Sequence, residues 1–251
     1  MTEPGAERRA AKEARLVPND NQNGRNDVVW DQTSLPAAVL WDMDGTIVDT
    51  EPAWVAAETA LAHRHGREWT EEDGLSLVGN SLLTSAHQIR ERLGLDLAPE
   101  AIVEELLDGV VESVRESVPW RPGARELLAE LQADGVPCAL VTMSYTRLVA
   151  PILEHLPEGT FTAVVTGDQV TYGKPHPEPY LAAAAALGLE PGDCVAVEDS
   201  ATGATSAETA GCAVLVVPNH VPVPPGPRRV FRDSLAGLHG PDLAAVQAEL
   251  A

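Results

Sequence analysis

The sequence predicts an α/β protein in which a doubly wound, Rossmann-like parallel sheet carries an inserted all-helical cap domain. Three observations lead to this fold class. Short apolar runs without polar alternation recur along the chain, as in strands that are buried on both faces of a parallel sheet. Helical patterns that stop at glycines separate these runs. One long interval, residues 53–120, contains helical patterns but no strand candidate.

Five apolar runs are predicted to form the strands of this sheet. Val, Leu and Ala dominate them, and helical segments among them stop at Gly135, Gly188 and Gly211, where left-handed caps are expected. A repeat of strand, helix and strand at this spacing predicts parallel strands joined by crossovers. The predicted strands are AAVLW (37–41), CALVT (138–142), AVVTG (163–167), CVAVE (194–198) and AVLVV (213–217).

The interval 53–120 predicts the helical insert. Residues 99–118 repeat apolar side chains at helical spacing, and another helix is expected to begin at a Ser81 cap and to end at Gly94. Because the insert directly follows the first strand, we expect it to cover the carboxyl end of the sheet. Open α/β folds bind their ligands at that end.

Changes in composition along the chain predict the domain boundaries. Residues 1–34 are polar and have no sustained hydrophobic period apart from a candidate short helix at 6–16, so a disordered N-terminal tail is expected there. The other expected parts are an α/β core at 35–52 and 121–240, the helical cap at 53–120 and a C-terminal helix at 241–251.

Charge and composition argue against several classes of partner. The 251 residues carry a formal net charge of -21, so we expect neither a nucleic acid nor an anionic membrane as partner. No apolar stretch has membrane-spanning length and residues 1–16 lack the apolar segment of a secretory signal, which predicts a cytoplasmic protein. The three scattered cysteines are expected to be small core residues. The sequence does not indicate the oligomeric state.

Polar side chains follow four of the predicted strands. Since the carboxyl ends of parallel strands meet at one edge of a sheet, these groups are expected to converge although they are far apart in the sequence. They are Asp42 and Asp44 after the first strand, Thr142 after the second, Lys174 in the loop after the third, and Glu198 and Asp199 after the fourth.

Four carboxylates in one crevice predict a divalent cation. Like charges repel and lose hydration at a buried strand end, and a cation offsets both costs. Mg²⁺ suits such an all-oxygen cluster, because it takes one or two carboxylates, keeps several waters and shares its shell with a phosphate. Lys174 and Thr142 would then supply a positive charge and a donor for the other phosphoryl oxygens, a combination suited to phosphoryl transfer.

These motifs resemble those of a known enzyme family. DMDGT, the Thr of VTMS, the Lys of GKPHP and the EDS of VEDSATGATSAETAG follow the order of the four motifs of the haloacid dehalogenase (HAD) superfamily. The helical insert after the first motif is similar in position to that of the capped phosphatases, the branch of phosphoglycolate phosphatase and β-phosphoglucomutase. The resemblance covers residues 37–218.

The resemblance implies a role for each matched residue. Asp42 would be the nucleophile that forms an aspartyl-phosphate, and Asp44 would protonate the leaving oxygen and then deprotonate the attacking water. Thr142 and Lys174 would bind the phosphoryl group.

The resemblance also implies a metal shell and a closing cap. Mg²⁺ would be held by the Asp42 carboxylate, the Asp44 backbone carbonyl and Asp199, with Glu198 as a close or outer ligand. The cap would close over the site and exclude water. Contacts with the substrate are expected from the cap loop LVGNS, namely from Gly79, Asn80 and Ser81.

The implied function is a Mg²⁺-dependent phosphatase whose partner is a small phosphorylated metabolite, such as a sugar phosphate. A phosphosugar mutase of the β-phosphoglucomutase type is an alternative, and a non-catalytic phosphate-ligand sensor is another. Counting from the nucleophile, the cap His and Arg of the mutase branch fall at Trp54 and Leu82 here, which favours the phosphatase.

Some of these residues also have purely structural interpretations. Threonine is common at strand ends, so Thr142 would fit there without a ligand. Asp199 or Ser200 would serve as the N-cap of the following helix. Trp54, Trp69 and Trp120 fit either the substrate surface of the cap or core packing, and they are left unassigned.

Overall fold

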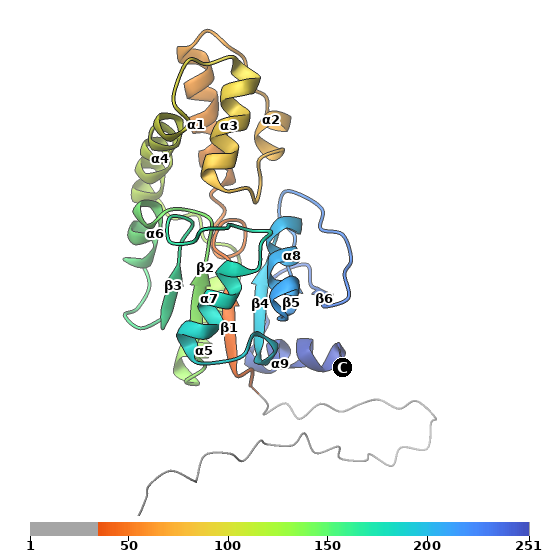
Figure 1. Ribbon diagram of the computed structural model, residues 1–251. Coiled ribbons are helices and arrows are strands. Elements are labelled where there is room, and N and C mark those ends of the chain that lie inside the picture. The colour runs from red at the N-terminus through yellow and green to blue at the C-terminus, as the bar shows by residue number, and fades with distance from the viewer. Residues whose placement is uncertain (1–34, 251) are drawn as a thin grey trace, which may run out of the picture. The chain divides into compact units, whose positions relative to one another are not determined.

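A parallel sheet of six strands organises residues 35–250, which this computed structural model describes (Figure 1). The strand order is β3-β2-β1-β4-β5-β6, with every neighbouring pair parallel. This is the order of a doubly wound sheet, so the predicted fold class is confirmed. The strands are β1 (Ala38–Trp41), β2 (Cys138–Val141), β3 (Ala163–Val165), β4 (Cys194–Glu198), β5 (Ala213–Val216) and β6 (Arg229–Phe231).

The five predicted strands are present, and β6 is an addition to them. β6 has three residues, and Val230 alone of these is buried. A short strand at the edge of a sheet needs no apolar run, because one of its sides has no neighbouring strand. The hydrophobic pattern therefore gave no signal for it.

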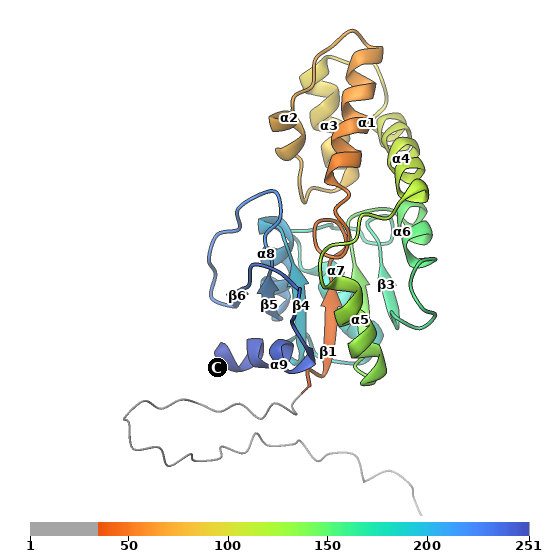
Figure 2. The ribbon, with the colours of Figure 1, turned by 180° about the vertical axis from the view of Figure 1, so that it is seen from behind.

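Helices cover both faces of the sheet. Alternate side chains of β1 point to opposite faces, so Val39 and Trp41 belong to one core cluster and Ala38 and Leu40 to the other. The Leu40 face is covered by α7 (Glu178–Leu187) and α8 (Ala201–Ala210), in front in Figure 1. The Trp41 face is covered by α5 (Ala124–Ala133), α6 (Thr146–Leu153) and α9 (Gly240–Glu249), of which α5 and α9 are in front in Figure 2. A short 3₁₀ helix, Pro191–Asp193, precedes β4.

The cap consists of helices that directly follow β1. They are α1 (Glu51–Arg64), α2 (Glu71–Leu75), α3 (Leu82–Leu93) and α4 (Pro99–Glu116). As predicted, α3 has Ser81 as its N-cap, whose hydroxyl accepts the Thr84 N–H, and the left-handed Gly94 as its C-cap. The apolar face of α4 is buried against α1 and α3. The five-residue α2 was not predicted; a capping box between Thr70 and Asp73 starts it.

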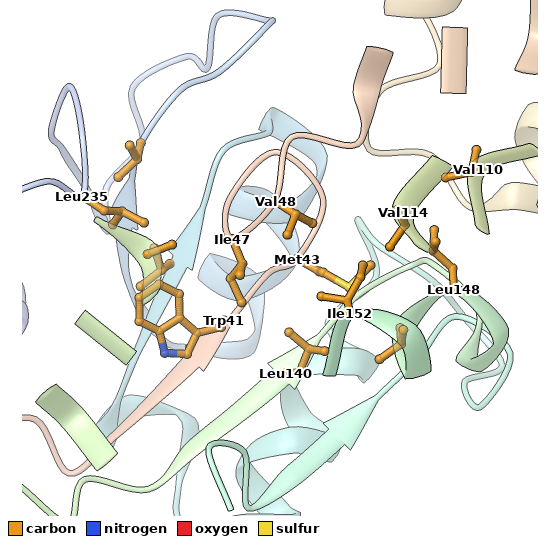
Figure 3. Packing of buried hydrophobic residues seen from close by; sticks show 14 of the residues in the cluster. Trp41, Met43, Ile47, Val48, Val110, Val114, Leu140, Leu148, Ile152 and Leu235 are labelled. Carbon is orange, nitrogen blue, oxygen red and sulfur yellow. The ribbon is translucent and has the colours of Figure 1, made fainter. Parts of the chain in front are cut away.

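Apolar packing fixes the loop between β1 and the cap. The Met43 side chain is fully buried in the core cluster that contains Leu140 of β2 and Ile152 of α6 (Figure 3). Met43 stands between Asp42 and Asp44 in the chain. Anchoring its side chain in the core therefore turns both carboxylates to the opposite side of the loop.

Several other expectations concern the periphery of the fold. The expected tail at 1–34, with its candidate helix at 6–16, lies outside the described residues. Within residues 35–250, no helix is both long enough and apolar enough to cross a membrane. Cys138, Cys194 and Cys212 are buried and unbridged, as predicted for core residues.

Truncating the apolar face of α4 should destabilise the protein. Leu107 is fully buried, so Leu107→Ala is expected to lower the free energy of unfolding by about 2–5 kcal/mol. Leu83, on α3, is 38% exposed and provides the control. Leu83→Ala should change stability by less than about 1 kcal/mol. Urea unfolding of the purified variants measures both, and equal effects would contradict the packing described here.

Candidate active site

A buried ion pair joins Asp42 and Lys174 at the carboxyl end of β1. The Lys174 Nζ lies 2.6 Å from Asp42 Oδ1 and 2.7 Å from Glu198 Oε1. It also donates to the Val141 backbone carbonyl at 2.9 Å. Burial by itself lowers the pKa of Lys174, but the two adjacent carboxylates outweigh burial and raise this pKa above its usual value. The ammonium group therefore stays charged, and its three hydrogens all have acceptors in the protein.

Glu198 is held in place by donors on both of its oxygens. Besides Lys174, the Tyr180 hydroxyl donates to Oε1 at 2.7 Å. The backbone N–H groups of Asp199 and Ser200 and the Ser200 hydroxyl donate to Oε2. A Cβ on Gly203 would come within 1.8 Å of Oε1, so only glycine leaves room for this carboxylate. Because both oxygens are occupied, Glu198 is suited to orienting Lys174.

The acidic cluster fits a divalent cation. Asp42, Glu198 and Asp199 each offer a carboxylate oxygen, and these oxygens lie within 4.8 Å of one another. Asp42 Oδ2 is buried and has no hydrogen-bond partner among the described residues. A buried acceptor without a partner is costly, and a cation would satisfy it. Gly45 also passes so close to Asp199 that a Cβ there would lie 1.9 Å from Oδ2.

Burial also sets the electrostatics of this cluster. The pKa of Asp42 is raised to about 7: burial is the largest cause, Lys174 opposes it, and the charges of Glu198 and Asp44 add to the rise. Desolvation and the charge of Asp42 raise the pKa of Asp199 well above its ordinary value. A bound cation favours the ionised form of both groups, so the site and the ion suit each other.

Three hydroxyl groups hold the Asp44 carboxylate. Thr50 Oγ1 donates to Oδ1 at 2.6 Å, and Thr142 Oγ1 and Ser144 Oγ each donate to Oδ2 at 2.9 Å. Thr142 is fully buried and does not line the cavity above the site, whereas Ser144 does. The Asp44 side chain stands outside the acidic cluster, so metal binding through its backbone carbonyl stays a prediction.

A cavity of about 90 Å³ lies between the cap and the carboxyl end of the sheet. Asp42, Asp44, Lys174 and Asp199 line its core side. From the predicted cap loop, Gly79 and Asn80 line the cavity but Ser81 does not, because the Ser81 hydroxyl caps α3. The loop is close to α8, since a Cβ on Gly79 would lie 3.2 Å from Thr202 Cβ.

The site contains residues that the sequence patterns did not single out. Thr50 and Ser144 stand within or beside the motifs, where hydroxyl groups have no periodic signature. Tyr180 reaches Glu198 from α7, and the one phenol in the run EPYLAAAAAL was the available signal. Ser200, rather than Asp199, is the N-cap of α8.

The cap contributes two carboxylates to the cavity. Glu58 is 5% exposed and accepts a hydrogen bond from Trp69 Nε1 at 2.8 Å. Burial raises the pKa of Glu58 to about 7, because the Trp69 hydrogen bond only partly opposes it. Burial and the neighbouring charge of Glu58 likewise raise the pKa of Glu51 to about 7, although His220 opposes the shift. Helical spacing from Glu51 would have pointed to Glu58.

The sequence comparisons identify the family to which this capped sheet with a buried acidic cluster belongs. The sequence model of the family of haloacid dehalogenase-like hydrolases matches residues 36–211. The chain therefore belongs to this family, which confirms the resemblance seen in its motifs.

Curated relatives include phosphatases. Hexitol phosphatase A of Escherichia coli (strain K12) is 34% identical over 180 residues, which cover 71% of this chain and 81% of that protein. The bifunctional riboflavin kinase/FMN phosphatase of Arabidopsis thaliana is 30% identical over 189 residues. That match covers 74% of this chain but only 49% of the bifunctional protein, so the chain spans about half of its length.

A solved structure shares the fold. The crystal structure of β-phosphoglucomutase from Clostridium difficile aligns with a TM-score of 0.76 at 23% identity. The alignment covers 86% of this chain and 98% of that one. At this identity the likeness concerns the fold alone.

The buried carboxylate of Glu58 should make stability depend on pH. Folding raises its pKa from 4.5 to about 7, so the folded state binds this proton more tightly than the unfolded chain does. The contribution of protonated Glu58 to the free energy of unfolding is complete below pH 4.5 and is lost as the pH rises to about 7. Over this range, wild type should lose up to about 3 kcal/mol of unfolding free energy relative to Glu58→Gln.

Urea unfolding at a series of pH values measures this difference. Glu112, on the exposed side of α4, provides a matched control. Glu112→Gln should keep the pH dependence of wild type. Identical pH profiles for wild type and Glu58→Gln would show that Glu58 does not titrate as described.

Proposed function

We propose that the protein is a Mg²⁺-dependent phosphatase that hydrolyses small phosphomonoesters, such as a sugar phosphate or a similar metabolite, through an aspartyl-phosphate. The observation that carries this proposal is the set of contacts made by the two carboxylate oxygens of Asp42. One of its oxygens is held by Lys174, the other is buried and has no hydrogen-bond partner within residues 35–250, and the side chain lines a cavity beneath a helical cap. The phosphatases among the relatives support the same reaction class.

The residues of the chain suit two successive displacements. In the first, Asp42 attacks phosphorus, an Asp42–phosphorus bond forms, and the ester P–O bond breaks as Asp44 gives its proton to the leaving oxygen. In the second, Asp44 takes a proton from water, the water oxygen bonds to phosphorus, and the Asp42–phosphorus bond breaks to release phosphate. The hydroxyls of Thr50, Thr142 and Ser144 orient Asp44 for both proton transfers.

The metal would be held by Asp42 and Asp199, with the Asp44 backbone carbonyl as a further ligand and Glu198 close to the shell. When bound, Mg²⁺ neutralises charge on the phosphoryl oxygens. Lys174 neutralises charge on Asp42 and Glu198. A direct contact between Lys174 and phosphate would require the ammonium group to exchange one of its three present acceptors.

The cavity lining favours a phosphatase over a mutase. Trp54 and Leu82 stand where the mutase branch is expected to carry its cap His and Arg, and both line the cavity. Neither side chain can act as an acid or base for substrate hydroxyls, and neither supplies a positive charge for a second phosphate. A sensor would not need the paired carboxylates Asp42 and Asp44.

Phosphate release from a panel of phosphomonoesters tests this function. We expect release that requires Mg²⁺ and stops when the metal is chelated. Asp42→Asn should lower kcat/KM by about 10³-fold or more, because an amide is no nucleophile for phosphorus. Asp134→Asn, an exposed change of the same kind after α5, is the control and should leave activity unchanged.

Two results would contradict the proposal. Comparable turnover by wild type and Asp42→Asn would remove Asp42 from the reaction. Activity that needs a bisphosphate activator and releases little inorganic phosphate would identify a mutase instead.

A further inference from the structure

The cap side of the cavity carries two carboxylates and, within residues 35–250, no Arg or Lys. Glu51, Trp54 and Glu58 have helical i, i+3, i+7 spacing, so they share one face of α1, and all three line the cavity. Apolar side chains make up much of the remaining cap lining, together with Asn80 and Ser85. Of the core residues that line it, Lys174 is paired with carboxylates, and His220 Nε2 contacts Asp49 Oδ1 at 2.6 Å.

Contacts with neighbouring cap residues hold the Glu58 side chain in the cavity lining. Its Oε2 accepts the Trp69 N–H, and a Cβ on Gly74 would lie 3.0 Å from the same oxygen. Oε1 remains as a second acceptor. The pKa values of Glu51 and Glu58 are raised because burial outweighs the opposing charge of His220 at Glu51 and the opposing Trp69 hydrogen bond at Glu58, so donors from a bound molecule would stabilise both carboxylates.

The two sides of the cavity therefore suit different parts of a substrate. The core side, with Lys174 and the metal ligands, suits a phosphoryl group. A carboxylate or a second phosphate on the alcohol part would face Glu51 and Glu58, and no Arg or Lys in the described cap lining would neutralise the like charges, which is unfavourable in a partly desolvated cavity.

On the basis of the proposed phosphatase function, we propose that the cap selects phosphomonoesters whose alcohol part is uncharged and rich in hydroxyl groups, and that Glu58 accepts a hydrogen bond from one of those hydroxyls. Hydroxyl groups both donate and accept, which matches the carboxylates of Glu51 and Glu58 together with the amide of Asn80 and the hydroxyl of Ser85. An ammonium group would use only the acceptors and leave the donors unmatched.

Kinetics of phosphate release with four esters test the proposal. They are a hexitol phosphate, phosphoglycolate, phosphoethanolamine, and methyl phosphate as the reference without further groups. For wild type, kcat/KM for the hexitol phosphate should exceed that for phosphoglycolate and for phosphoethanolamine at least about tenfold. When kcat/KM for each ester is divided by kcat/KM for methyl phosphate, Glu58→Gln should lower the ratio for the hexitol phosphate about tenfold. The same substitution should raise the ratio for phosphoglycolate.

Two further variants complete the experiment. Glu112→Gln removes a cap charge outside the cavity and should keep all the ratios of wild type. Glu51→Gln removes the other cavity carboxylate and should shift the ratios in the direction predicted for Glu58→Gln. It provides the test if Glu58→Gln does not fold.

The possible failures are distinct. Preference for phosphoglycolate or phosphoethanolamine, or ratios that neither cavity variant changes, would overturn the selectivity while leaving the phosphatase intact. Absence of phosphate release from every ester in the presence of Mg²⁺ would overturn the phosphatase and the selectivity together.

Discussion

The ammonium group of Lys174 is the contact on which the carboxyl edge of the sheet depends. Its three hydrogen bonds reach Asp42 after β1, the Val141 carbonyl at the end of β2, and Glu198 at the end of β4, while Lys174 itself belongs to the loop after β3. One buried cation thus joins the ends of four strands. Without it, Asp42 and Glu198 would lose the positive charge that offsets their burial, and removing one partner of a buried ion pair is strongly destabilising. With it, one Asp42 oxygen is held by Lys174, and the other has no hydrogen-bond partner in the part of the chain that the structure describes.

Packing makes this arrangement of charges possible. Met43 anchors the loop that carries Asp42 and Asp44, and two glycines give the carboxylates room, Gly203 beside Glu198 and Gly45 beside Asp199. The cap then encloses the crevice from above with a wall that is acidic and apolar. In the proposed function, the core side binds the phosphoryl group and the cap side contacts the rest of the substrate, so chemistry and selectivity would reside in separate parts of the fold.

The sequence predicted most of the fold because buried parallel strands and glycine-stopped helices leave strong periodic patterns. It also predicted that Asp42, Lys174 and Glu198 converge, since strand ends in a parallel sheet share one edge. It did not reveal how the hydrogen bonds are shared: that Thr142 donates to Asp44, or that Tyr180 supports Glu198. Such partners depend on side-chain directions that no pattern of residue types encodes. Glu58 was missed because one acidic residue in a helix usually faces solvent.

The most direct test of the central claim is a crystal structure of the protein grown with Mn²⁺, in which anomalous scattering locates the ion. The account predicts one strong peak at the carboxyl edge of the sheet, bound by the free oxygen of Asp42 and by Asp199, with Lys174 still paired to Asp42. A peak elsewhere, or none at a saturating concentration of the ion, would contradict it.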